Sequence, residues 1–160
     1  MALASRQDYI KLIEEDYFGN LVRENISAAI ACFSDDARIS VRHGDAPVRR
    51  FSVDGDDDTT SLWDFYTHLC GNYHIWFGEF SHYIDEAESR AASTFRVVLN
   101  PKPDSPYGSA GTQTLFNCNF FQFSDGRIVD MTIYYSNPNS GRQAATSTQS
   151  VPTGYPPQGK

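Results

Sequence analysis

Residues 61–80, Ser-Leu-Trp-Asp-Phe-Tyr-Thr-His-Leu-Cys-Gly-Asn-Tyr-His-Ile-Trp-Phe-Gly-Glu-Phe, contain the main change of hydrophobic period in this chain. Their first half has the i, i+3, i+4, i+7 spacing of an amphipathic helix, in Leu62, Phe65, Tyr66 and Leu69. Gly71 ends that helix, and residues 73–84 then form a long aromatic stretch typical of a strand. The chain therefore divides into a largely helical part and an extended part.

Two further helices are predicted on the N-terminal side. Ser5-x-x-Asp8 resembles a capping box before a helix over about residues 6–19, whose apolar stripe is Tyr9, Ile13 and Tyr17. Asn25 can cap a second, shorter helix. Residues 37–42 alternate in polarity and predict a strand, and residues 48–53 predict a weaker one.

Four long strands are predicted on the C-terminal side, over residues 73–84, 90–100, 112–123 and 128–135. Residues 101–111 hold three prolines and two glycines, which predicts a loop and a candidate lid. Residues 138–160 consist mostly of Ser, Thr, Gln, Pro and Gly, so we expect a tail that is disordered or ordered only by a partner, after one domain over residues 1–137.

The formal net charge of −7 argues against nucleic acid and against an anionic membrane surface as partners, since both need a basic face. No apolar run approaches the roughly 20 residues of a spanning helix, and no signal peptide is recognised. Cys32, Cys70 and Cys118 suit neither a disulfide framework nor a zinc site. We therefore expect a cytoplasmic protein without a metal or other cofactor.

Two local sequences carry a resemblance to a known family. Asp16-Tyr17-Phe18 followed by Phe33-Ser-Asp-Asp-Ala-Arg-Ile39, and the hairpin from Phe121 to Ile128, resemble the NTF2-like superfamily, in particular its SnoaL-like, ketosteroid isomerase-like and scytalone dehydratase-like group. The resemblance covers about residues 5–136. It implies an α+β cone, with three N-terminal helices packed on a strongly curved mixed or antiparallel sheet and an apolar pocket between them.

The same resemblance implies catalytic residues. Tyr17 and Asn119 match positions whose side chains donate hydrogen bonds to a substrate oxygen in isomerases of this group, and His74 lies near the place of a pocket histidine in the dehydratases. Packing in the core is the alternative for Tyr17, and a position at the rim is the alternative for His74. Val41 stands where the isomerases carry an aspartate, and Val22 stands where related dehydratases often carry one, which argues against both reactions.

Strand alternation predicts the walls of the pocket. The expected ligand-binding residues are His43, Trp76, Phe95, Val97, Leu99, Asn117, Met131 and Tyr135. Alternation also gives His74, Trp76, Phe80 and His82 the same parity. The rival orientation of residues 112–123 would turn Asn117 and Asn119 to solvent. In the preferred one, Phe116, Phe120 and Tyr134 lie on the convex face and predict a homodimer.

Two functions follow from these expectations. The first is a cofactor-free acid/base enzyme, an isomerase, dehydratase or cyclase, acting on a small hydrophobic compound of polyketide, steroid or aromatic type. The second is a non-catalytic ligand-binding or structural subunit of the same fold, as in the small dioxygenase subunits. Because one fold hosts many reactions, the sequence fixes no substrate.

Overall fold

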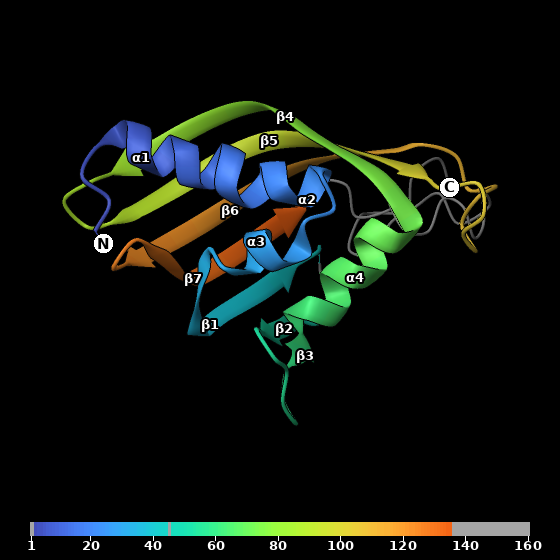
Figure 1. The fold of residues 1–160 in the computed structure, drawn as a ribbon, viewed down its shortest axis with the longest axis horizontal. Coiled ribbons are helices and arrows are strands. Elements are labelled where there is room, and N and C mark those ends of the chain that lie inside the picture. The colour runs from blue at the N-terminus through green and yellow to red at the C-terminus, as the bar shows by residue number, and fades with distance from the viewer. Residues whose placement is uncertain (1, 45, 136–160) are drawn as a thin grey trace, which may run out of the picture.

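The computed structural model describes residues 2–44 and 46–135 (Figure 1). The predicted tail over residues 138–160 lies outside this range, and of Tyr135 only the backbone is described. The helices are α1 (Arg6–Lys11), η1 (Leu12–Gly19), α2 (Asn20–Val22), α3 (Ile26–Ile30) and α4 (Leu62–Asn72). The strands are β1 (Phe33–Arg42), β2 (Arg49–Ser52), β3 (Thr60–Ser61), β4 (Tyr73–Asp85), β5 (Arg90–Pro101), β6 (Gln113–Ser124) and β7 (Arg127–Tyr135).

The seven strands form one mixed sheet in the order β3-β2-β1-β7-β6-β5-β4. β4, β5, β6 and β7 are joined as an antiparallel meander, whereas β1 lies parallel to β7 and β3 lies parallel to β2. The sheet curves, and the helices lie across its concave face (Figure 1). The mixed sheet agrees with the sequence prediction, and the core lies between the two layers.

The continuous helical segment formed by α1, η1 and α2 provides most of the cover. Ser5 and Asp8 form the predicted capping box at its start. Its middle, η1, is a π-helix over Leu12–Gly19, a form that is rare and often found at functional sites. Tyr17 and Phe18 of this segment are both buried against the sheet.

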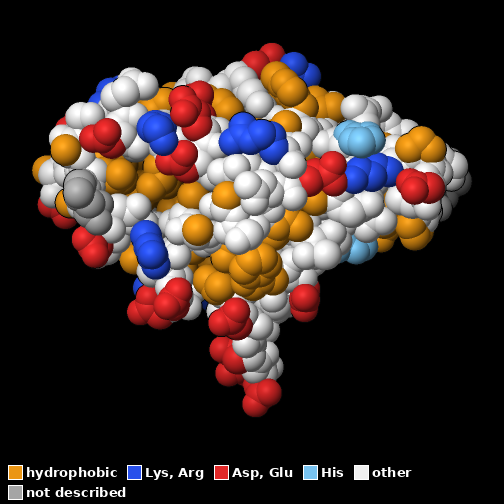
Figure 2. Space-filling model, viewed as in Figure 1, with side chains coloured by type: hydrophobic (Ala, Val, Ile, Leu, Met, Phe, Trp, Pro, Cys, Tyr) orange, Lys and Arg blue, Asp and Glu red, His pale blue; other side chains and the backbone are white. Residues whose placement is uncertain are grey.

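β1 and β3 differ most from the sequence prediction. β1 begins at Phe33 rather than at residue 37, because Phe33 pairs with Ile128 of β7 and is taken into the sheet. The short strand β3 was not predicted, and it precedes α4, whose N-cap is Ser61. The loop between β2 and β3 projects from the body of the protein, and acidic side chains gather on this projection (Figure 2).

A β-bulge in β4 changes which of its side chains face the helices. Gly78 pairs with Arg96, but the next pair is Ser81 with Thr94, so β4 holds one more residue than β5 between them. Glu79 in the bulge has a positive φ of 58°. A bulge of this kind inverts the alternation of the residues that follow it. Phe77 therefore faces the core before the bulge, and Phe80 and His82 do so after it.

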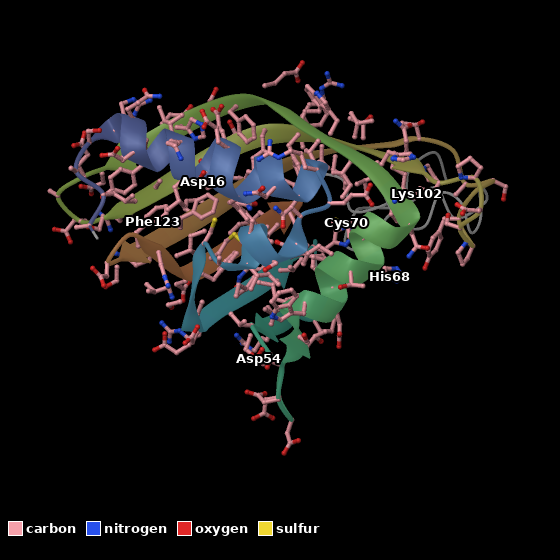
Figure 3. The ribbon with its side chains drawn as sticks, viewed as in Figure 1. Asp16, Asp54, His68, Cys70, Lys102 and Phe123 are labelled. Carbon is pink, nitrogen blue, oxygen red and sulfur yellow. The ribbon has the colours of Figure 1, made fainter. Side chains whose placement is uncertain are left out.

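The loop after β5 is held against the end of α4 by several contacts. Lys102 Nζ donates to Cys70 O at 2.8 Å and forms an ion pair with Glu24 at 2.6 Å, and Figure 3 shows Lys102 close to this end of α4. The Tyr107 ring stacks on Tyr73, with 5.5 Å between ring centroids. These contacts fix the candidate lid at one end of the helical layer.

Candidate functional site

A small cavity of about 70 Å³ lies between the helical layer and the concave face of the sheet. Its lining is mostly apolar and comes from η1, α2, α4 and strands β4 to β7. The lining residues are Tyr17, Phe18, Leu21, Phe65, Tyr66, Leu69, Phe77, Phe95, Val97, Leu99, Leu115, Asn117, Asn119 and Ile133. Phe65, Leu69, Phe77 and Leu99 are only half-buried and form the rim. The volume holds about two water molecules at roughly 30 Å³ each.

A pair of phenols stands on the helical side of the cavity. Tyr17 comes from η1 and Tyr66 from α4, and their hydroxyl groups form a hydrogen bond with each other. Both rings are buried, and Tyr17 also packs edge-on against Phe33. Sequence reasoning selected Tyr17 and missed Tyr66, although Tyr66 follows Leu62 by four residues on the apolar stripe of α4.

Two amide side chains stand on the sheet side. Asn117 and Asn119 are adjacent inward-facing residues of β6, and Asn119 is only 1% exposed. The Oδ1 atom of each is buried without a hydrogen-bond partner among the described residues. The Nδ2 group of Asn119 donates to the sulfur of Met131 at 3.6 Å, which orients the amide with Oδ1 as the unpaired atom. The cavity thus presents acceptors, where the resemblance had implied a donor at Asn119.

His74 and Trp76 do not reach the cavity. They precede the bulge in β4 and lie on the convex face of the sheet, where His74 is exposed and the Trp76 ring lies 4.9 Å from the Arg96 guanidinium carbon. The prediction that placed Trp76 in the pocket is wrong, and His74 is not brought to Tyr17 and Asn119. The reason is the extra residue at Glu79, which gives His82 and not His74 the inward position.

The other predicted ligand-binding residues whose side chains are described divide into two groups, which leaves Tyr135 untested. Phe95, Val97 and Leu99 line the cavity, as does Asn117. Met131 is fully buried beneath Asn119 without lining the cavity, and His43 lies in the turn after β1.

The positions at which relatives carry aspartates offer no acidic group here. Val22 is exposed at the end of α2, and Val41 is buried in β1. Among the described residues that line the cavity, the titratable groups are the two phenols. A carboxylate or imidazole that could accept a proton from a ligand in the cavity is not among them.

The described residues contain no group of three or more His, Cys, Asp or Glu side chains arranged to hold a metal ion. Cys70 lies next to the cavity, in α4, and donates to Leu21 O at 3.6 Å. Burial raises the pKa of the Cys70 thiol, and it raises that of Cys32 to about 12. Such thiols are protonated at neutral pH and act as small apolar groups. No described helix is both long and apolar enough to cross a membrane.

Comparison with known proteins gives matches of structure only. No family model matches the chain, and no curated protein sequence matches it. A candidate polyketide cyclase from Xanthomonas campestris superposes with a TM-score of 0.62 at 17% identity, over 83% of this chain and 93% of that one.

Two further structures show the same likeness. An LEH-like epoxide hydrolase from Mycobacterium tuberculosis has a TM-score of 0.60 at 14% identity, over 87% of this chain and 90% of that one. An NTF2-like protein from Burkholderia xenovorans has a TM-score of 0.62 at 13% identity, over 89% and 98%. At these identities the likeness concerns the fold. The helical layer, the curved mixed sheet and these structural neighbours together show that the chain has the fold of the NTF2-like superfamily, in agreement with the resemblance in its sequence.

Proposed function

We propose that this chain binds a small, largely apolar compound that carries hydroxyl groups, and that it holds this compound without converting it. The observation that carries the proposal is the pair of buried Oδ1 atoms of Asn117 and Asn119, which face an apolar cavity and have no hydrogen-bond partner among the described residues. A buried unpaired acceptor costs about 1–3 kcal/mol. An occupant that donates hydrogen bonds to both oxygens removes this cost, and the apolar walls favour a ring or short hydrocarbon between the donors.

The volume limits the size of the occupant. An engineered apolar cavity that binds benzene measures about 150 Å³, which is about twice the volume here. A single aromatic ring therefore requires the half-buried rim, in particular Phe65 and Leu69, to move outward. A polycyclic compound would need a larger rearrangement, so we favour a ligand with one ring.

An acid/base enzyme is the second candidate. The hydrogen-bonded pair of Tyr17 and Tyr66 favours it, because a phenol that is itself hydrogen-bonded can stabilise negative charge on a substrate oxygen. Proteins of similar fold include a candidate polyketide cyclase and an LEH-like epoxide hydrolase. We prefer binding to catalysis because the described lining residues include no carboxylate or imidazole.

Binding of matched probe compounds tests the proposal. Resorcinol carries two hydroxyl donors, and anisole is a ring of similar size without any. We expect Asn119→Leu to weaken resorcinol binding about fivefold, the equivalent of one hydrogen bond of about 1 kcal/mol, and to leave anisole binding unchanged or tighter. Dissociation constants from NMR titration measure both. Equal effects on the two probes would show that Asn119 does not recognise donors.

Mass spectrometry of the protein purified under native conditions separates the two candidates. A compound that co-purifies and remains chemically unchanged after long incubation supports binding alone. Conversion of that compound by the wild type, with loss of the conversion in Tyr17→Phe, would establish the enzyme instead. Since Tyr17→Phe removes only the hydroxyl, the packing of the ring against Phe33 is retained.

We also propose that the protein forms a homodimer through the convex face of the sheet. Phe116, Phe120 and Tyr134 are 55%, 50% and 43% exposed, and the rings of Phe120 and Tyr134 meet edge-on at 5.7 Å. A cluster of exposed rings on neighbouring strands is costly in water and typical of an interface. A second copy of the same face can cover it with the same residues.

A further inference from the structure

Three side chains form a hydrogen-bonded chain from the helical layer to the inner face of the sheet. His82 Nε2 lies 2.7 Å from Glu14 Oε1, and His82 Nδ1 lies 2.8 Å from Ser93 Oγ. The Glu14 side chain is 37% exposed, the His82 side chain is 5% exposed, and Ser93 is fully buried. The chain thus leads from solvent into the core, and the function proposed above does not use it.

The inner end of this chain meets the site. Ser93 of β5 is paired with Asn119 of β6 in the sheet register, and both side chains are on the inner face. Directly paired residues of antiparallel strands have Cβ atoms about 5 Å apart, so the two side chains are neighbours. No hydrogen bond joins Ser93 Oγ to Asn119 Oδ1 in the structure, so contact between them requires a rotation of the Asn119 side chain. Asn119 Oδ1 is one of the two buried acceptors without a hydrogen-bond partner in the described part of the chain.

The protonation state of the His82 imidazole determines whether the Ser93 hydroxyl can donate a hydrogen bond to Asn119. When the imidazole is neutral and its Nε2–H donates to the Glu14 carboxylate, Nδ1 carries a lone pair and accepts the hydroxyl proton of Ser93. When the imidazole is protonated, Nδ1–H donates to Ser93 Oγ. The hydroxyl proton of Ser93 is then released and becomes available to Asn119 Oδ1 when the Asn119 side chain rotates toward it.

We propose that His82 and Ser93 are positioning residues that control the hydrogen bonding of Asn119. With neutral His82, Asn119 Oδ1 is open to a donor on a ligand; with protonated His82, Ser93 occupies it. Only the effect on ligand binding rests on the function proposed above, because the coupling between His82 and Asn119 exists in the protein without a ligand.

The charged groups around His82 are few and come from the elements packed against it. Glu14 approaches from η1, and the Arg6 guanidinium of α1 donates to the backbone oxygen of His82 at 3.3 Å. At the end of β4 and β5, Asp85 and Arg90 form an ion pair with each other at 3.0 Å. Phe80 stacks on the imidazole from within β4 and contributes no charge.

NMR spectroscopy of the full chain without ligand tests the coupling. The ring signals of His82 and the side-chain NH₂ signals of Asn119 are followed between about pH 5 and pH 8, the range in which imidazoles titrate. We expect the Asn119 signals to shift along the same curve as the His82 ring. Asn117, which is paired with Phe95 rather than with a hydroxyl, is the internal control and should not follow that curve.

Three variants separate coupling through Ser93 from a general effect of pH. In Ser93→Ala the His82 ring should still titrate while the Asn119 signals stay fixed, and in Ser93→Thr, which keeps the hydroxyl, the coupling should return. Glu14→Gln changes a half-exposed residue and should displace both curves together along the pH axis. A His82 ring that does not titrate, fixed Asn119 signals in the wild type, or coupling that survives Ser93→Ala would each overturn the proposal.

Discussion

Asn119 combines two properties that seldom occur together: it is completely buried, and its acceptor oxygen has no hydrogen-bond partner within residues 2–44 and 46–135. Because an unpaired buried acceptor is unfavourable, we expect this residue to lower the stability of the empty protein. Asn119→Leu should therefore raise the free energy of unfolding by about 1 kcal/mol, while Asn119→Ala, which leaves a void, should lower it. Urea unfolding of both variants measures the difference. Equal losses in both would mean that ordered water satisfies Asn119 in the free protein.

Sequence reasoning at this scale found the positions but not the roles. The alternation of β6 and the family resemblance brought Asn117 and Asn119 to the cavity, and they suggested that Asn119 donates. The structure turns its NH₂ group to Met131, a residue 12 positions away in the sequence. An amide orientation depends on such distant neighbours, so no local pattern could have predicted it.

The buried thiols give a second prediction for single residues. Burial raises the pKa of Cys32 to about 12, and the thiolate is the reactive form, so Cys32 should not react with a thiol reagent at pH 8 while the protein is folded. A raised folded-state pKa stabilises the protein below the pKa of the unfolded thiol, and the contribution is lost as the pH rises toward 12. Mass spectrometry after labelling in buffer and in urea checks both states. Rapid modification of Cys32 in buffer would contradict its burial.

At the scale of elements, the bulge of β4 decides which face each of its side chains occupies. It places Phe80 and His82 inward, and the chain Glu14–His82–Ser93 depends on it. Strict alternation along the sequence predicts that His82 and His74 lie on the same face. Within Gly78-Glu79-Phe80 only the glycine indicates a possible bulge, so the extra residue was not predicted. Most element boundaries and the capping box at Ser5 were predictable from local spacing, whereas the start of β1 and the bulge were not.

Deletion of Glu79 tests this account of β4. With Glu79 removed, β4 and β5 each hold one residue between the Gly78–Arg96 and Ser81–Thr94 pairs, so Phe80 lies opposite Phe95, and Phe80 and His82 stay on the concave face in the same register. We therefore expect this deletion to change the free energy of unfolding only slightly, because what it removes is the exposed ion pair between Glu79 and Arg96. Deletion of Ser81 is the matched control, because it would place Glu79 opposite Phe95 and turn Phe80 to the convex face, and the lost burial of that ring should cost about 2 kcal/mol or more. Urea unfolding of both variants measures the difference, and equal stability of the two would contradict the role of the bulge.

At the scale of the whole molecule, the two faces of the sheet have different roles. The concave face holds the cavity and the buried polar groups, and the convex face carries the exposed rings. This difference follows from the period of two in β6, where Asn117 and Asn119 alternate with Phe116, Cys118 and Phe120.

We expect the convex face to be covered by a second copy of the chain. Phe120→Asn should then convert a dimer to a monomer in sedimentation velocity, and Trp63→Asn, an exposed ring on α4, should not.

Labelling of Cys118 reports on the proposed dimer interface without a substitution. Cys118 lies on the convex face next to Tyr134 in the sheet register, and partial burial raises the pKa of its thiol. A partner subunit would cover it further, so dilution that dissociates the dimer should increase its rate of labelling per molecule by mass action. Cys32 and Cys70 are buried in the core of one subunit and should show no dependence on concentration. In Phe120→Asn the rate at Cys118 should be high at every concentration. A rate in the wild type that is equally high at all concentrations would mean that the convex face is open to solvent, and the exposed rings would then have to serve another partner.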